Sequence, residues 1–168
     1  MVTISWRSGS RKVLTKDGYV RCTEVYTFSP NGSCTRAQMV TFLWRANGSP
    51  KATGSTPFTD VNAGAYYYDA VLWAVEKGIT NGTSASTFSP DAVLTRSQAV
   101  TFLYRAAGSP VVSGNSFDDV DSDAWYANAV IWAVSEGVTV GTGGNHFSPD
   151  APCTRGQIVT FLYRNMEQ

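Results

Sequence analysis

The sequence predicts an all-α fold in which three helical-hairpin repeats form a pseudo-threefold helical bundle. The first observation is that the segment Thr95–Ala106 occurs three times, with the other copies beginning at Thr35 and Thr154. The second is that Phe-Ser-Pro followed by Asn or Asp precedes each copy, at spacings of 60 and 59 residues. The third is that Ala-Val-x-Trp-Ala-Val occurs at 70–75 and again at 129–134. Such a period indicates stacked copies of one supersecondary unit.

The copies divide the chain into a first repeat at 1–57, a second at 58–116 and a third at 117–168, all within one domain. The first repeat is incomplete, because residues 1–27 lack the Phe-x-Asp-Val that opens the other two. We expect poor local order there until about Tyr26.

Each complete repeat opens with an amphipathic helix. Apolar residues at helical spacing predict it at about 65–77 and about 124–136, where Trp73 and Trp132 are expected in the core. Gly78 and Gly137 are natural C-caps.

The second helix of each repeat is the Thr-Arg helix. In the middle copy, apolar residues at 99, 100, 102, 103, 106 and 107 predict a broad buried face. Its start has the Thr-x-x-Gln pattern of a capping box, in which two side chains satisfy exposed backbone N–H groups. The capping residues are therefore Thr35 with Gln38, Thr95 with Gln98, and Thr154 with Gln157.

An arginine follows the capping threonine in every copy: Arg36, Arg96 and Arg155. A cation in the first turn opposes the helix dipole at a cost of roughly 0.3–1 kcal/mol. An anion bound there would reverse this cost, because free N–H groups, the dipole and the guanidinium would all point at it. The alternative is that each arginine pairs with a carboxylate or lies solvated on the surface.

The amino-acid composition limits the kinds of partner that the chain can bind. With 43% hydrophobic residues, 15% charged residues and a formal net charge of zero, the chain lacks the basic field typical of nucleic-acid binding. No apolar run is long enough for membrane insertion, and the first residues do not match a signal peptide. Cys34 and Cys153 occupy one repeat position and are read as small buried residues, while Cys22 has no counterpart. Neither a disulfide framework nor a metal site is indicated.

The recurring Phe-x-Asp-Val, Ala-Val-x-Trp-Ala-Val-x-x-Gly, Gly-Thr, Phe-Ser-Pro-Asp and Thr-Arg-x-Gln motifs resemble the S-layer homology domain of bacterial surface proteins. The resemblance implies a pseudo-trimer with the three Thr-Arg helices at its centre. It also implies a non-catalytic and monomeric module of a larger surface protein, without a cofactor. Such a module binds a peptidoglycan-linked secondary cell-wall polymer, often one with pyruvate ketals, at the bacterial cell surface.

The resemblance also suggests binding residues, each with a structural alternative. Asp60 and Asp119 would bond sugar hydroxyls or cap a short turn. Gly82 and Gly141 would let a ligand approach the backbone or serve turn geometry. Sugar rings favour aromatic platforms, which Tyr66 and Trp125 would supply unless they pack in the core. The family's Thr-Arg-Ala-Glu has Gln in place of Glu in all three copies here.

Three other classes of function compete with this interpretation. Catalysis has little support, since His146 is the single histidine and Thr27 and Thr87 stand at the matched positions. Alternating acids at Asp119, Asp121 and Asp123 resemble a calcium loop, but the other complete copy has Asp60, Asn62 and Gly64. A protein–protein interaction module is the third alternative, and its binding would not depend on the carboxylates of the polymer.

Overall fold

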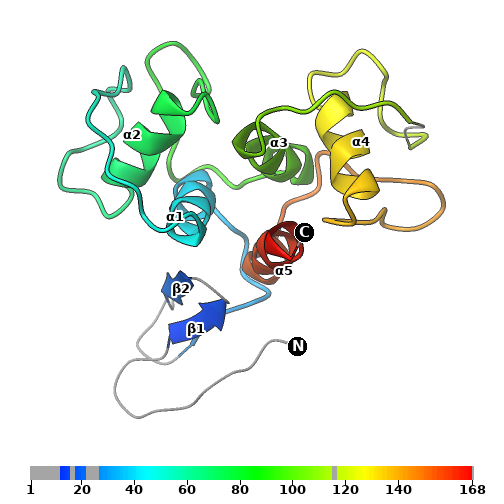
Figure 1. Ribbon diagram of the computed structural model, residues 1–168, viewed down its shortest axis with the longest axis horizontal. Helices are drawn as coiled ribbons and strands as arrows, with labels where there is room; N and C mark the ends of the chain where they lie inside the picture. Colours follow the sequence, from blue (N-terminus) through cyan, green and yellow to red (C-terminus); the bar gives the residue numbers. More distant parts are fainter. Residues whose placement is uncertain (1–11, 16–17, 22–26, 115–116, 168) are drawn as a thin grey trace.

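The computed structural model describes residues 12–15, 18–21, 27–114 and 117–167 (Figure 1). These residues form five α-helices and one short antiparallel hairpin, so the predicted all-α class is confirmed. The elements in chain order are β1 (Lys12–Thr15), β2 (Gly18–Arg21), α1 (Arg36–Ala46), α2 (Tyr68–Glu76), α3 (Arg96–Ala106), α4 (Ala127–Ser135) and α5 (Arg155–Met166).

The three Thr-Arg helices lie at the centre. Helices α1, α3 and α5 contact one another in pairs, and α2 and α4 pack on the outer sides of α1 and α3 (Figure 1). The apolar faces of these helices form one buried core. The pairwise packing is as the repeats predict, while the pseudo-threefold relation itself stays a prediction.

A closed ring of backbone hydrogen bonds joins the segments that lead into the three central helices. Cys34 N–H donates to the carbonyl of Cys153, Cys153 N–H donates to that of Leu94, and Leu94 N–H donates to that of Cys34. Each of these bonds is 2.8 Å long. All three side chains are fully buried, which explains why this repeat position takes small or aliphatic apolar residues.

Each central helix begins with a complete capping box. In α1, α3 and α5 the N-cap threonine accepts from the N3 backbone N–H, and the N3 glutamine accepts from the threonine N–H. The pairs are those that the sequence predicts: Thr35 with Gln38, Thr95 with Gln98, and Thr154 with Gln157.

The outer helices are shorter than the sequence predicts. Helices α2 and α4 start three residues later than expected, because residues 65–67 and 124–126 form hydrogen-bonded turns before them. The C-caps are as predicted, since Gly78 and Gly137 adopt φ values of 67° and 64°. Trp73 and Trp132 are buried as expected, at 5% and 4% exposure.

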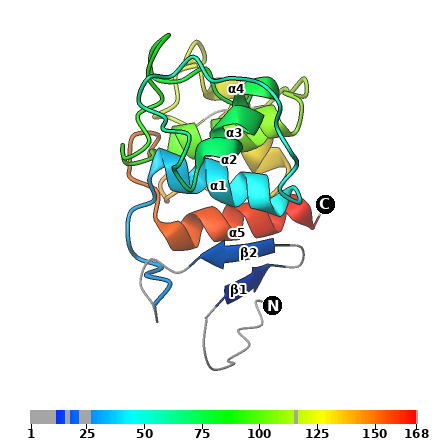
Figure 2. The ribbon, with the colours of Figure 1, turned by 90° about the vertical axis from the view of Figure 1, so that its left-hand side faces the viewer.

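The start of the chain differs from expectation. The prediction of poor order up to about Tyr26 is wrong for the hairpin, in which Lys12 pairs with Arg21 and Thr15 with Gly18. Val13, Tyr19 and Val20 have high strand propensity, which helical periodicity alone overlooks. Figure 2 shows the hairpin at one side of the bundle, where β2 contacts α1. The rest of residues 1–26, including Cys22, lies outside the described residues.

Candidate functional site

The three repeated arginines are buried and reach across to a neighbouring repeat. Arg36, Arg96 and Arg155 are 3–5% exposed. Each Nε donates to the carbonyl of the phenylalanine in a Phe-Ser-Pro loop, with distances of 2.8–3.0 Å. The three pairs are Arg36 with Phe88, Arg96 with Phe147, and Arg155 with Phe28. The arginines therefore fasten the repeats to one another.

Aromatic rings surround each guanidinium. The carbon at its centre lies 4.7–5.9 Å from the centroids of two phenylalanine rings, one in the loop and one in a central helix. Burial lowers the pKa of Arg36 to about 10 and also lowers the pKa of Arg96. Both stay charged at neutral pH, and cation–π contacts offset part of the desolvation cost.

The expectation of free backbone N–H groups at these helix starts is wrong. In α5, Arg155 N–H and Gly156 N–H donate to the carbonyls of Gly32 and Pro30, and Gln157 N–H donates to the Thr154 hydroxyl. The matching amides of α1 and α3 are used in the same way. The sequence could not show this, because the acceptors lie in other repeats. An anion would meet guanidinium groups here, not helix amides.

Asp60 and Asp119 hold the Phe-Ser-Pro loops. The two oxygens of Asp119 accept from the N–H groups of Phe147 and Ser148, both at 2.7 Å, and Asp60 does the same for Phe88 and Ser89. Desolvation acts to raise the pKa of Asp119, but these backbone hydrogen bonds outweigh it and hold that pKa below its ordinary value. Both carboxylates thus bind a loop that lies 28 residues further along the chain.

Gly82 and Gly141 are required by packing. A Cβ on Gly141 would lie 2.6 Å from the His146 carbonyl oxygen and 2.6 Å from the ring of Phe117. Gly82 has φ +79°, and a Cβ there would lie 2.5 Å from the Phe58 ring. Both contacts are too close for any other residue, so the fold alone accounts for these glycines.

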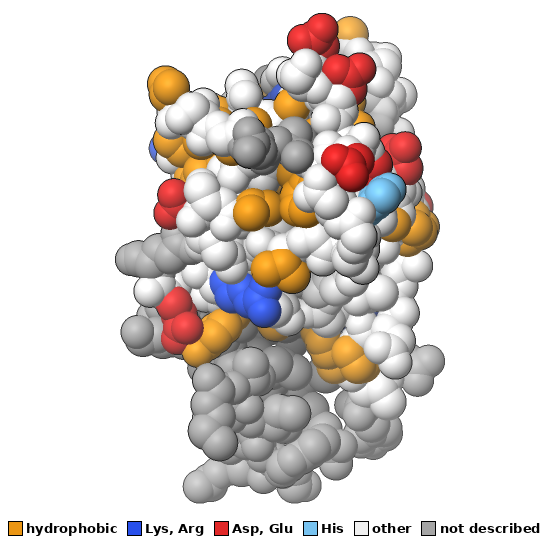
Figure 3. Space-filling model, turned by 90° about the vertical axis from the view of Figure 1, so that its right-hand side faces the viewer, with side chains coloured by type: hydrophobic (Ala, Val, Ile, Leu, Met, Phe, Trp, Pro, Cys, Tyr) orange, Lys and Arg blue, Asp and Glu red, His pale blue; other side chains and the backbone are white. Residues whose placement is uncertain are grey.

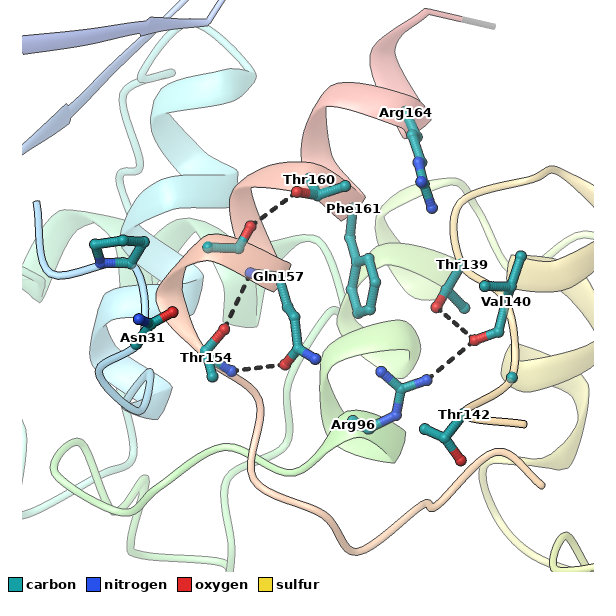
Figure 4. Close-up of a pocket in the computed structure, with 13 residues that line it drawn as sticks. Asn31, Arg96, Thr139, Val140, Thr142, Thr154, Gln157, Thr160, Phe161 and Arg164 are labelled. Carbon is teal, nitrogen blue, oxygen red and sulfur yellow. Dashed lines mark hydrogen bonds between the residues drawn. The ribbon is translucent and has the colours of Figure 1, made fainter. Parts of the chain in front are cut away.

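A groove with a volume of about 610 Å³ lies where residues of all three repeats meet (Figure 4). Arg96 forms part of its floor, and the loop after α4 contributes one side. The other side comes from α5 and from the loop of the first repeat: Pro30, Asn31, Thr154, Gly156, Gln157, Thr160, Phe161 and Arg164. Four sequence segments thus meet at one surface: 30–31, Arg96, 139–142 and 154–164.

The groove is positively charged and rich in hydroxyl groups. Arg96 and Arg164 both line it, and none of the described lining residues carries a carboxylate. Figure 3 shows one face of the molecule, where a cluster of exposed Lys and Arg atoms has one acidic side chain beside it and the other acidic side chains lie farther away. Such a groove suits an anionic, hydroxyl-bearing ligand.

The groove combines predicted and unpredicted residues. Arg96, Gly141, Thr154 and Gln157 meet there. Sequence reasoning missed Asn31, Thr139, Thr142, Thr160 and Arg164 as lining residues. Repetition could have indicated two of them. Thr142 belongs to the Gly-Thr that follows each outer helix, and Arg164 belongs to the Tyr-Arg or Trp-Arg that ends each Thr-Arg motif.

The predicted aromatic platforms lie on the surface. Tyr66 and Trp125 are 53% and 62% exposed, so they do not pack in the core. Each ring stands edge-on to the next aromatic residue, with centroids 5.1 Å apart: Tyr66 on Tyr67, and Trp125 on Tyr126. Neither lines the groove beside Arg96.

Two further findings concern the described part of the chain. Cys34 and Cys153 are free, and burial raises the pKa of these thiols to about 12 and about 11, so both are inert apolar residues. No described helix combines the length and apolar character needed to cross a bilayer.

The fold and groove define a helical repeat module with a positively charged surface site. The family profile described as the S-layer homology domain matches residues 57–100 and 116–159. The chain belongs to the S-layer homology domain family. The profile covers the second and third repeats, and the assignment of an incomplete first repeat stays our proposal.

Relatives are large surface proteins and enzymes. A cell surface protein of Thermoanaerobacter kivui is 31% identical over 116 residues, which cover 66% of this chain and 15% of the relative. The S-layer protein sap of Bacillus anthracis is 30% identical over 68% of this chain and 14% of its own length. An endoglucanase of Bacillus sp. (strain KSM-635) is 33% identical over 95% of this chain and 18% of the enzyme. The chain thus spans less than one fifth of each.

Proposed function

We propose that this chain is a non-catalytic anchoring module that binds an anionic, pyruvylated secondary cell-wall polysaccharide at the bacterial cell surface. The observation that carries the proposal is the groove lined by Arg96 and Arg164, with no carboxylate among its described lining residues. Membership of the S-layer homology family and the surface location in the relatives' names support it.

The chemistry of the groove fits a sugar acid. A pyruvate ketal presents a carboxylate close to a sugar ring, and guanidinium groups bind carboxylates through charge-assisted hydrogen bonds. The threonine hydroxyls at 139, 142 and 160 offer donors and acceptors for sugar hydroxyls. The exposed rings of Tyr66 and Trp125 would bind further sugars along the polymer.

Arg36 and Arg155 would provide weaker versions of the same site. Their backbone amides are occupied like those beside Arg96, so these amides would not bind the ligand. Asp60, Asp119, Gly82 and Gly141 would act mainly by shaping the loops. Several weak contacts with one polymer raise the effective concentration, so the module needs no tight single site.

Co-sedimentation with purified cell-wall sacculi tests the proposal. Arg164→Gln removes one charge from the groove at an exposed side chain, and Lys77→Gln removes the charge of another exposed side chain, outside the groove. We expect Arg164→Gln to weaken retention severalfold, with Lys77→Gln unchanged and retention falling as salt rises. Chemical removal of pyruvate from the sacculi should abolish binding of the wild type.

The proposal would be overturned if neither Arg164→Gln nor the removal of pyruvate changed how much protein the sacculi retain. The remaining interpretation would then be a protein–protein interaction module of a surface assembly.

A further inference from the structure

Two of the three cysteines lie opposite each other at the centre of the molecule. Cys34 N–H donates to the Cys153 carbonyl at 2.8 Å, within the ring of hydrogen bonds that joins the segments before the central helices. The neighbouring residues Ser33 and Thr154 form an antiparallel bridge. In an antiparallel pair, one step forward along one segment is matched by one step back along the other. Cys34 and Cys153 are therefore direct cross-strand neighbours.

This register brings the two thiols within reach of a covalent bond. Opposite residues of an antiparallel pair have Cβ atoms roughly 4.5–5.5 Å apart, whereas a disulfide needs about 3.5–4.5 Å. A mutual approach of about 1 Å is therefore enough. Both side chains are fully buried in one core. Burial raises the pKa of Cys34 to about 12, Arg155 acts to lower it, and the charge of Cys153 adds to the increase, as expected for two thiols close together.

A bond between these sulfurs would join the first repeat to the third. Cys34 precedes α1 and Cys153 precedes α5, while the third corner of the ring is Leu94, which has no thiol. The ring therefore allows a single pairing. The closed loop would contain the whole second repeat, and cross-links that close long loops restrict the unfolded chain most. The folded state would be stabilised as a result.

We propose that Cys34 and Cys153 are a disulfide site, at which the first and third repeats become covalently joined when the chain folds under oxidising conditions. The Sγ–Sγ bond forms as both S–H bonds break. The two protons and two electrons pass to a disulfide-bearing oxidant, which leaves as two thiols. Cell surfaces are among the environments where disulfides persist. The cross-link needs no polysaccharide, so it is independent of the proposed function.

The bond must form before the core closes. In the folded, reduced protein, burial keeps both thiols protonated, and the thiolate is the form that attacks a disulfide. The inertness of these cysteines thus belongs to the finished fold. The same burial would protect the completed disulfide from reducing agents, because an attacking thiolate cannot reach either sulfur.

The cross-link would lie beside the loop of the incomplete first repeat. Arg155 Nε donates to the Phe28 carbonyl at 3.0 Å, and Gly156 N–H donates to the Pro30 carbonyl at 2.9 Å. Residues 1–27 contain no Phe-x-Asp-Val, whose aspartate holds the matched loop in each complete repeat. A disulfide would add a covalent connection at the interface whose sequence does not supply that aspartate.

Oxidative refolding of the full chain tests the proposal. The Cys22→Ser variant keeps only Cys34 and Cys153 and is refolded from urea with reduced and oxidised glutathione. Trypsin without reductant should then release peptides 22–36 and 106–155 as one linked species, lighter by two hydrogens than their sum. We expect its Tm to lie at least about 5 °C above that of the same variant refolded with dithiothreitol.

The matched control is Cys34→Ala in the Cys22→Ser background, which should melt at the same temperature after either refolding. If Cys22→Ser does not fold, the wild type is mapped with chymotrypsin, which cleaves after Tyr26 and so separates Cys22 from Cys34. Folded, oxidised protein in which the two peptides remain unlinked, or are linked only between molecules, would rule out the site. A linked protein with no rise in Tm would contradict the stabilising role.

Discussion

The loops at Phe147 and Phe28 have the same sequence motif but different support. Phe147 is fully buried, its ring lies 5.7 Å from that of Phe117, and Asp119 accepts from its backbone N–H. Phe28 is only partly buried. Yet each accepts an arginine Nε on its carbonyl and stacks against the guanidinium, at 4.7 Å for Phe147 and 4.9 Å for Phe28.

The difference separates two functions of the loop. The arginine–phenylalanine contact is common to all three interfaces and joins the repeats, while the aspartate bonds are an addition in the complete repeats. The arginine is first a structural residue, and ligand binding by it is part of our proposal. The terminal nitrogens of the arginines also differ. The buried Nη2 of Arg36 has no hydrogen-bond partner among the described residues, whereas the Nη2 of Arg96 donates to the Val140 carbonyl.

The largest effect should come from the buried loop rings. We expect Phe147→Ala to lower the free energy of unfolding by about 3–5 kcal/mol, as for other buried aromatic residues, and Phe28→Ala by at most about half as much. Urea unfolding followed by circular dichroism measures both. Equal losses would show that the loop of the first repeat is as firmly packed as that of the third.

Next in size is the loss of the arginine itself. Arg96→Ala removes the hydrogen bonds to the carbonyls of Phe147 and Val140 and the stacking on Phe147, so we expect a loss of about 2–4 kcal/mol. The exposed Arg164→Ala should cost less than about 0.5 kcal/mol. The same unfolding measurement compares them, and a stable Arg96→Ala would contradict the structural role.

The aspartate bonds should contribute less. We expect Asp119→Asn to cost about 1–3 kcal/mol at neutral pH, because the amide keeps one acceptor oxygen and turns a donor toward the other N–H. The exposed Asp118→Asn is the matched control.

The pH dependence of stability gives an independent check on Asp119. Since the pKa of Asp119 is depressed in the folded state, its contribution is complete above the ordinary value of 3.8 and is lost as pH falls through the folded-state pKa. The Asp119→Asn variant should lack this part of the loss of stability at low pH. An unchanged acid profile in the variant would argue against the depressed pKa.

Sequence reasoning predicted what is local. The capping boxes, Gly78 and Gly137 as C-caps, and the burial of Trp73 depend on spacings within one helix, which the chain displays directly. What it missed is non-local. Arg36 and Phe88 are 52 residues apart and Arg155 and Phe28 are 127 apart, so no local pattern links them.

The candidate site was predicted in part for the same reason. Repetition singled out Arg96 and Gln157 separately, but only the packing of α3 beside α5 brings them to one groove. The hydrogen bonds from Phe88 and Phe147 to Asp60 and Asp119 span 28 residues and could not be read from capping rules.

The most direct test of the central claim is to map where the intact polymer binds. Solubilised cell-wall polymer would be added to the ¹⁵N-labelled protein, and the shift of every assigned amide would be recorded. We predict the largest changes at 139–142 and 157–164, the two walls of the groove beside Arg96. Changes confined to the outer faces of α2 and α4, with the groove amides unmoved, would contradict the account.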